Sequence, residues 1–168
     1  EGSDPERQLA GWHRLLNQLV GLGVTSVNVA GVRPDGLKQV QTLYDRWGDE
    51  LPRMTVQLRL SPGYDTHDDP EEGVRESIAE LDAIGDRDKL FNHPKLKLGA
   101  AKMSIDGGLS APIFWSLKPY ENRPGFYGEQ RIPDSAFYRV AKHAHDLGWQ
   151  VGIHTMGDAA TVMVANEL

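Results

Sequence analysis

Helical and strand patterns alternate along this chain, and that alternation restricts its fold more than any other feature. Apolar residues at helical spacing predict five helices, over residues 3–23, 35–50, 68–85, 133–148 and 158–168. Short segments with β-branched or strictly alternating apolar residues predict four intervening strands, over residues 24–30, 53–60, 96–106 and 149–154. Strands that alternate with helices form parallel sheets with right-handed crossovers. The sequence therefore predicts an α/β fold built from parallel βα units.

Composition limits the classes of protein to which the chain can belong. Its 168 residues, 39% apolar and 25% charged, lead us to expect one domain over residues 1–168 and no separate second domain. A net charge of −6 without a Lys/Arg cluster argues against a nucleic-acid partner, and the absence of cysteine excludes disulfides and thiolate metal ligands. Because we find neither a membrane-spanning apolar run nor a signal peptide, we expect a cytoplasmic protein without a membrane partner.

Lys102 stands among small and apolar neighbours in the segment AAKMSIDGG, where burial of an ammonium group is unfavourable unless the group is paired or chemically altered. Strand periodicity places Lys102, Ser104 and Asp106 on one face and apolar residues on the other. His154 similarly ends the next predicted strand. In a (β/α)8 barrel, chemistry occurs at the carboxyl ends of the strands. Lys102 and His154 are therefore candidate metal ligands, with simple structural pairing as the alternative for each.

Asp106 and Asp158 have different expected roles. Four residues of extended strand span about 13 Å, too far for Asp106 to share a metal with Lys102 unless the chain turns sharply. We expect Asp106 to order the glycine-rich loop that follows it, with contact to a metal ligand as the alternative. Asp158, at the start of the last helix, is expected to be its cap.

Two further groups near this site have competing interpretations. His143 and His145 imitate a paired-histidine metal motif, but on a helix their side chains point about 200° apart, so one ion cannot bind both. Aromatic residues in the long loop from Gly107 to about Ile132 either line an apolar substrate pocket or pack beneath the loop. These aromatic residues are Phe114, Trp115, Tyr120, Phe126 and Tyr127.

Two longer segments carry a family resemblance: AKMSIDGGLSAPIFWSLKPYENRPGFYG, and AKHAHDLGWQVGIHTMGDAA with its His-x-x-Gly-Asp-Ala-Ala element. They resemble the amidohydrolase superfamily, in its amidohydrolase 3 branch, which includes N-substituted formamide deformylase and exoenzyme regulatory proteins. The resemblance implies a metal-dependent hydrolase acting on amide-type, non-peptide C–N bonds of small molecules. It also implies a divalent metal, zinc, bound by His154 and by Lys102, whose side chain can be carboxylated in this superfamily.

The predicted fold is the middle portion of a TIM (β/α)8 barrel, about four of its eight βα units, with a partial catalytic barrel over residues 1–168. The first residue is Glu1 rather than methionine, and the His-x-His strand of the family is missing, so we expect an internal slice that is inactive alone. We expect such a slice to lack the metal, to keep Lys102 uncarboxylated and to self-associate through exposed sheet edges. The alternatives are a non-catalytic binding or regulatory module and a flavodoxin-like sandwich.

Overall fold

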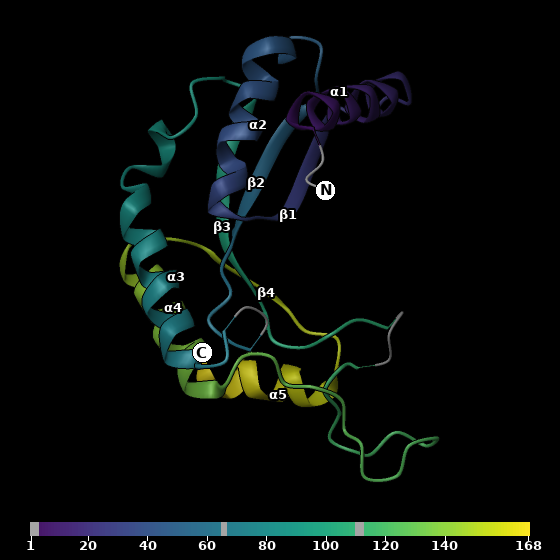
Figure 1. Cartoon of the computed structure of the whole chain (residues 1–168), viewed down its shortest axis with the longest axis vertical. Coiled ribbons are helices and arrows are strands. Elements are labelled where there is room, and N and C mark those ends of the chain that lie inside the picture. The colour runs from purple at the N-terminus through teal and green to yellow at the C-terminus, as the bar shows by residue number, and fades with distance from the viewer. Residues whose placement is uncertain (1–3, 65–66, 110–112) are drawn as a thin grey trace. The chain divides into compact units, whose positions relative to one another are not determined.

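The computed structural model describes residues 4–64, 67–109 and 113–168, and its strands and helices alternate along the chain (Figure 1). The sheet has the strand order β1-β2-β3-β4, and both the β1–β2 and β3–β4 pairs are parallel. Its strands are β1 (Ser26–Val32), β2 (Arg53–Arg59), β3 (Leu96–Ser104) and β4 (Val151–His154). The helices are α1 (Pro5–Gly21), α2 (Pro34–Trp47), α3 (Pro70–Ile84), α4 (Asp134–Asp146) and α5 (Asp158–Glu167), with a short 3-10 helix at Arg87–Lys89.

The chain divides into two compact units, one formed by Glu1–Arg59 and Ile84–Ala100, the other by Leu60–Ala83 and Ala101–Leu168. In the first unit, β2 alternates as its sequence predicts. Met54, Val56 and Leu58 are buried, whereas the residues between them are partly exposed. This alternation gives the strand one apolar face, which contributes to the core of the unit.

The second unit has its core on the apolar faces of its helices. Helix α4 buries Phe137 and Val140, and α5 buries Ala160 and Met163. Helices α3 and α4 lie side by side (Figure 1), and polar contacts connect them. One of these contacts joins the Arg139 guanidinium to the Glu71 carboxylate at 2.6 Å. Because exposed ion pairs contribute little, burial of the apolar faces is the main stabilising interaction.

Burial along β3 changes phase in the middle of the strand. Leu96, Leu98 and Ala100 are buried, and then Ala101 and Met103 are buried instead. As a result, Lys102 and Ser104 are only partly buried, although strict alternation with the first three would have placed them in the core. The phase change allows a lysine to lie in an apolar strand without burying its ammonium group.

All five predicted helices and all four predicted strands are present, with differences at their ends. β1 begins at Ser26 rather than at residue 24, because residues 22–25 close the end of α1: Gly23 has a φ of 84°, and the Val24 amide bonds the Leu19 carbonyl at 3.0 Å. β3 ends at Ser104 rather than at residue 106. Ser3, predicted as helical, lies outside the described residues. Within those residues, no helix is both long and apolar enough to cross a membrane.

Consecutive strand order separates the two candidate folds. A flavodoxin-like sheet has the order 2-1-3-4-5, whereas the strands of a TIM barrel follow one another in chain order. The order β1-β2-β3-β4 therefore agrees with the predicted portion of a barrel and contradicts the flavodoxin-like alternative.

Tyr44 is the largest fully buried polar side chain of the first unit and gives a test of its core. Its side chain is 1% exposed, and its hydroxyl donates a 2.7 Å hydrogen bond to the Pro52 carbonyl. Burial raises the pKa of Tyr44 to about 12 from its usual value near 10. The folded state therefore favours the neutral phenol. This stabilisation is complete below pH 10 and is lost as the pH rises through about 12.

We expect the Tyr44→Phe substitution to lower the free energy of unfolding by about 1–2 kcal/mol at neutral pH, because the buried Pro52 carbonyl loses its donor. Between pH 10 and pH 12, urea unfolding should show a smaller loss of stability in the variant than in the wild type. Tyr138→Phe is the control, since Tyr138 is 45% exposed. Equal pH dependence in Tyr44→Phe and the wild type would contradict this role of Tyr44.

Candidate metal site

The two predicted metal ligands lie on the same face of neighbouring strands. In the parallel pairing of β3 with β4, Lys102 is opposite Gly152 and Ser104 is opposite His154. Opposite residues in a sheet point to the same side, so Lys102, Ser104 and His154 share one face. Both strands end at the Ser104–His154 pair, and Lys102 lies two residues before Ser104 in β3. The structure therefore brings Lys102 and His154 to one face and one end of the sheet, while their binding of a metal stays a prediction.

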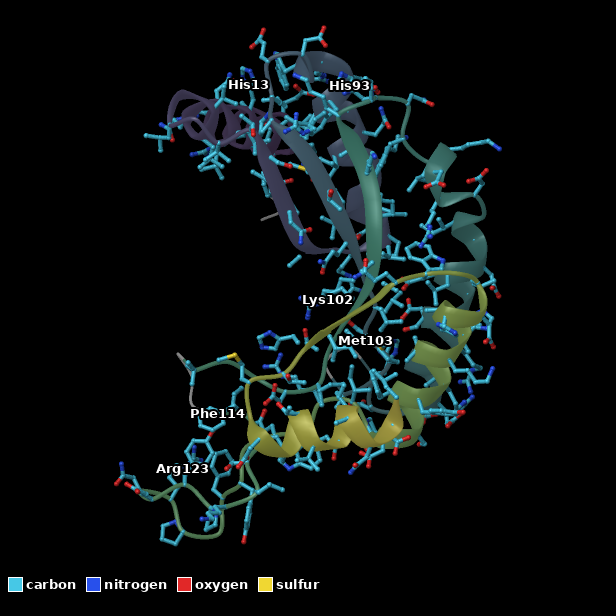
Figure 2. All side chains as sticks on the ribbon, turned by 180° about the vertical axis from the view of Figure 1, so that it is seen from behind. His13, His93, Lys102, Met103, Phe114 and Arg123 are labelled. Carbon is cyan, nitrogen blue, oxygen red and sulfur yellow. The ribbon has the colours of Figure 1, made fainter. Side chains whose placement is uncertain are left out.

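The Lys102 side chain is directed away from the helix-covered face of its strand. Figure 2 shows Lys102 and Met103 on opposite sides of β3, and Met103 is 1% exposed. The Lys102 ammonium donates to the Met103 carbonyl at 2.9 Å and to Ser104 Oγ at 3.3 Å. Ser104 is the functional candidate that sequence reasoning did not select, although its position two residues after Lys102 indicated the shared face.

The structure places His143 and His145 away from this site. Both lie on α4, where His143 contacts the Asp82 carboxylate of α3 at 2.8 Å and His145 is exposed. Within residues 4–64, 67–109 and 113–168, no three His, Cys, Asp or Glu side chains gather as a metal site. The described chain therefore offers two candidate ligands rather than a complete set.

Asp106 orders the loop after β3, as predicted. Its side chain is 1% exposed and accepts hydrogen bonds from three backbone amides. Trp115 and Gly157 donate to Oδ2 at 3.0 and 2.7 Å, and Met156 donates to Oδ1 at 2.9 Å. Such donors compensate the buried negative charge. The carboxylate of Asp106 thus joins the loop to the turn between β4 and α5.

Asp158 has a different role from the predicted helix cap. Gly157 is the N-cap residue of α5, and Asp158 is the first residue of the helix. The Asp158 carboxylate accepts from the amides of Leu117 and Ala159, each at 2.9 Å. The hydrogen bond from the Leu117 amide is the main reason that the pKa of Asp158 lies below its usual value. Asp158 thus attaches the loop to the first turn of α5.

Three of the aromatic loop residues, Phe114, Tyr120 and Phe126, pack against one another. The ring centroids of Phe114 and Tyr120 are 4.9 Å apart, and those of Tyr120 and Phe126 are 5.3 Å apart. The Arg123 guanidinium lies over the Phe126 ring at 3.8 Å from its centroid, and the Tyr120 hydroxyl donates to the Phe114 carbonyl at 2.8 Å. For these three residues, the contacts favour packing within the loop over the alternative of an apolar pocket, although all three rings stay partly exposed.

Solved structures share the fold. The crystal structure of an uncharacterized metal-dependent hydrolase from Pyrococcus horikoshii OT3 matches with a TM-score of 0.75 and 24% identity, covering 97% of this chain and 30% of that one. A second uncharacterized metal-dependent hydrolase, from Pyrococcus furiosus, matches with a TM-score of 0.68 and 22% identity, covering 92% of this chain and 29% of that one. The fold is therefore that of part of a metal-dependent hydrolase barrel.

Sequence comparison identifies the family. The amidohydrolase family model matches residues 2–168, so the chain belongs to the amidohydrolase family, and the predicted resemblance is confirmed. The putative amidohydrolase YtcJ of Bacillus subtilis (strain 168) is 31% identical over 75 residues, which are 45% of this chain and 14% of that protein. The chain thus spans less than a third of the length of each of these relatives.

A substitution at Gly157 tests how closely the loop approaches the turn after β4. A Cβ atom at this position would lie 1.6 Å from the Trp115 carbonyl oxygen. We expect Gly157→Ala to displace the loop, to destabilise the protein by about 1–3 kcal/mol and to speed amide hydrogen exchange at Trp115 and Leu117. In the control Gly108→Ala, the added Cβ meets no atom of the described residues within 4 Å. Exchange at Trp115 that is equally slow in both variants would contradict this close approach.

Proposed function

We propose that this chain is part of a metal-dependent hydrolase that cleaves amide-type, non-peptide C–N bonds in small molecules. The observation that supports the proposal is the placement of Lys102 and His154 on one face, at the carboxyl ends of adjacent strands, in a member of the amidohydrolase family. Because the chain spans less than a third of its solved relatives, the activity is proposed for the whole protein.

The donor set fits a divalent metal such as zinc, which binds imidazole nitrogen and carboxylate-type oxygen. A bound metal of this kind supplies hydroxide near neutral pH and polarises a carbonyl group. His154 would provide an imidazole nitrogen. Catalytic zinc usually has three protein ligands, so at least one further ligand would have to join Lys102 and His154.

Lys102 needs a chemical change before it can bind a metal. Its ammonium group donates hydrogen bonds to Met103 and Ser104, and a protonated amine has no lone pair for a cation. Loss of protons from Nζ and formation of a bond to carbon dioxide would give a carbamate, whose two oxygens are anionic ligands. The neighbouring Ser104 hydroxyl could then donate to a carbamate oxygen, since a hydroxyl both donates and accepts.

Metal content tests the assignment of both ligands. In the full-length protein we expect Lys102→Ala and His154→Ala each to lower the bound zinc by at least about tenfold at a fixed free zinc concentration, because each removes a ligand. Elemental analysis after equilibrium dialysis is the measurement.

Two matched substitutions serve as controls for these variants. Lys97→Ala removes an exposed lysine from the same strand, and His145→Ala removes an exposed histidine from α4. Metal content that is unchanged in Lys102→Ala would remove Lys102 from the site. A full-length protein without metal or hydrolase activity would instead support the non-catalytic binding module.

Self-association is the second proposal for the isolated 168-residue chain. β1 and β4 stand at the two ends of the strand order, so within the described residues each pairs on one side only. Unpaired strand edges are templates for pairing with another chain. We expect sedimentation velocity to show oligomers whose fraction increases with concentration. A monodisperse monomer across the concentration range would contradict this proposal.

A further inference from the structure

We propose that Asp106 is a positioning residue that holds His154 and the loop of residues 113–131 in one fixed arrangement. This inference rests on the proposed function, because it assigns Asp106 to the support of a proposed metal ligand. The Asp106 side chain contacts neither a metal nor a substrate in this proposal. It acts through the backbone of the turn that follows His154 and through the base of the loop.

The backbone of His154 is held on both sides. Before the turn, the His154 carbonyl accepts a 3.0 Å hydrogen bond from the Ile105 amide, directly before Asp106 in the chain. After it, the amides of Met156 and Gly157 both donate to the Asp106 carboxylate. Residues 105 and 106 therefore bond to the chain at His154 and again two and three residues later. These hydrogen bonds restrict the backbone conformation at His154. They therefore keep its side chain on the face of the sheet that it shares with Lys102.

The Asp106 carboxylate also binds the loop of residues 113–131. The two sides of the loop pair with each other, with the Ser116 amide 2.7 Å from the Tyr127 carbonyl and the Glu129 amide 3.0 Å from the Ile113 carbonyl. The Trp115 amide, at the base of this pair, donates to Asp106. Figure 2 shows Phe114 near the base and Arg123 further along the loop, which extends beyond α5. A substitution at Asp106 therefore affects both the loop and the turn after His154.

The chemistry of the carboxylate explains why aspartate is required. Both of its oxygens accept, and Oδ2 accepts two amides at once. Asparagine has a single acceptor oxygen, so at least one of the three amides would face an NH2 group and lose its partner. Asp106 is 1% exposed, which limits replacement of that partner by water. The predicted consequence is a looser loop and a less precisely held His154.

The experiment compares Asp106→Asn with Asp158→Asn in the full-length protein, loaded with cobalt(II) in place of zinc. Asp158 also holds the loop, through the Leu117 amide, but does not bond to Met156 or to Gly157. In Asp106→Asn we expect amide exchange at Trp115, Met156 and Gly157 to accelerate at least tenfold. We also expect an altered cobalt absorption spectrum and about tenfold weaker metal binding. Both amides that bond Asp158 do so at Oδ1, an acceptor that asparagine keeps, so Asp158→Asn should leave exchange at Leu117 and the cobalt spectrum unchanged.

Three outcomes would overturn the positioning role of Asp106 or distinguish its failure from a failure of the proposed function. An unchanged cobalt spectrum, together with unchanged exchange at Met156 and Gly157 in Asp106→Asn, would overturn the positioning role. A wild-type protein that binds no cobalt would overturn the proposed function, while the exchange data would still test the coupling. If Asp106→Asn does not fold, exchange in the wild type decides. Amides released in one opening event share a protection factor, which is the intrinsic exchange rate of each amide divided by its observed rate. Clearly different protection factors at Trp115 and Met156 would contradict the proposal.

Discussion

The arrangement of the second unit depends on one buried carboxylate. Asp106 accepts three backbone amides that come from two segments distant in sequence, the loop and the turn between β4 and α5. A buried carboxylate is strongly unfavourable without such donors, so the side chain and the two segments require one another. Gly157 completes the junction, since a side chain there would overlap the Trp115 carbonyl.

The candidate metal site depends on the pairing of β3 with β4. Parallel pairing sets Ser104 opposite His154 and brings Lys102 to the same face. Because both strands end together, their polar residues occupy the end at which barrel enzymes carry out chemistry. The face and the end are therefore consequences of strand register, whereas a complete ligand set needs residues beyond Lys102 and His154, the two candidates in the described part of the chain.

Much of this could be predicted from local patterns. Alternation in β2 and the helical spacing in α4 identify the elements, and Lys102 and His154 are conspicuous because they interrupt apolar strands. The start of β1 was misplaced because β-branched Val24 is consistent with a strand, yet its amide closes the end of α1. The predicted role of Asp158 as a helix cap was wrong. Its partner Leu117 lies 41 residues away in the chain, and no local sequence pattern indicates a partner at that separation.

The sequence by itself determined the succession of helices and strands, the family and the strand faces of the two candidate ligands, because side-chain periodicity and family motifs are local properties. Tertiary structure alone decided the phase change that leaves Lys102 partly exposed and the three amides that converge on Asp106. It also decided that Phe114, Tyr120 and Phe126 of the loop pack against one another. The physical reason is that burial and hydrogen-bond partners depend on segments far apart in the chain, and only folding brings these segments together.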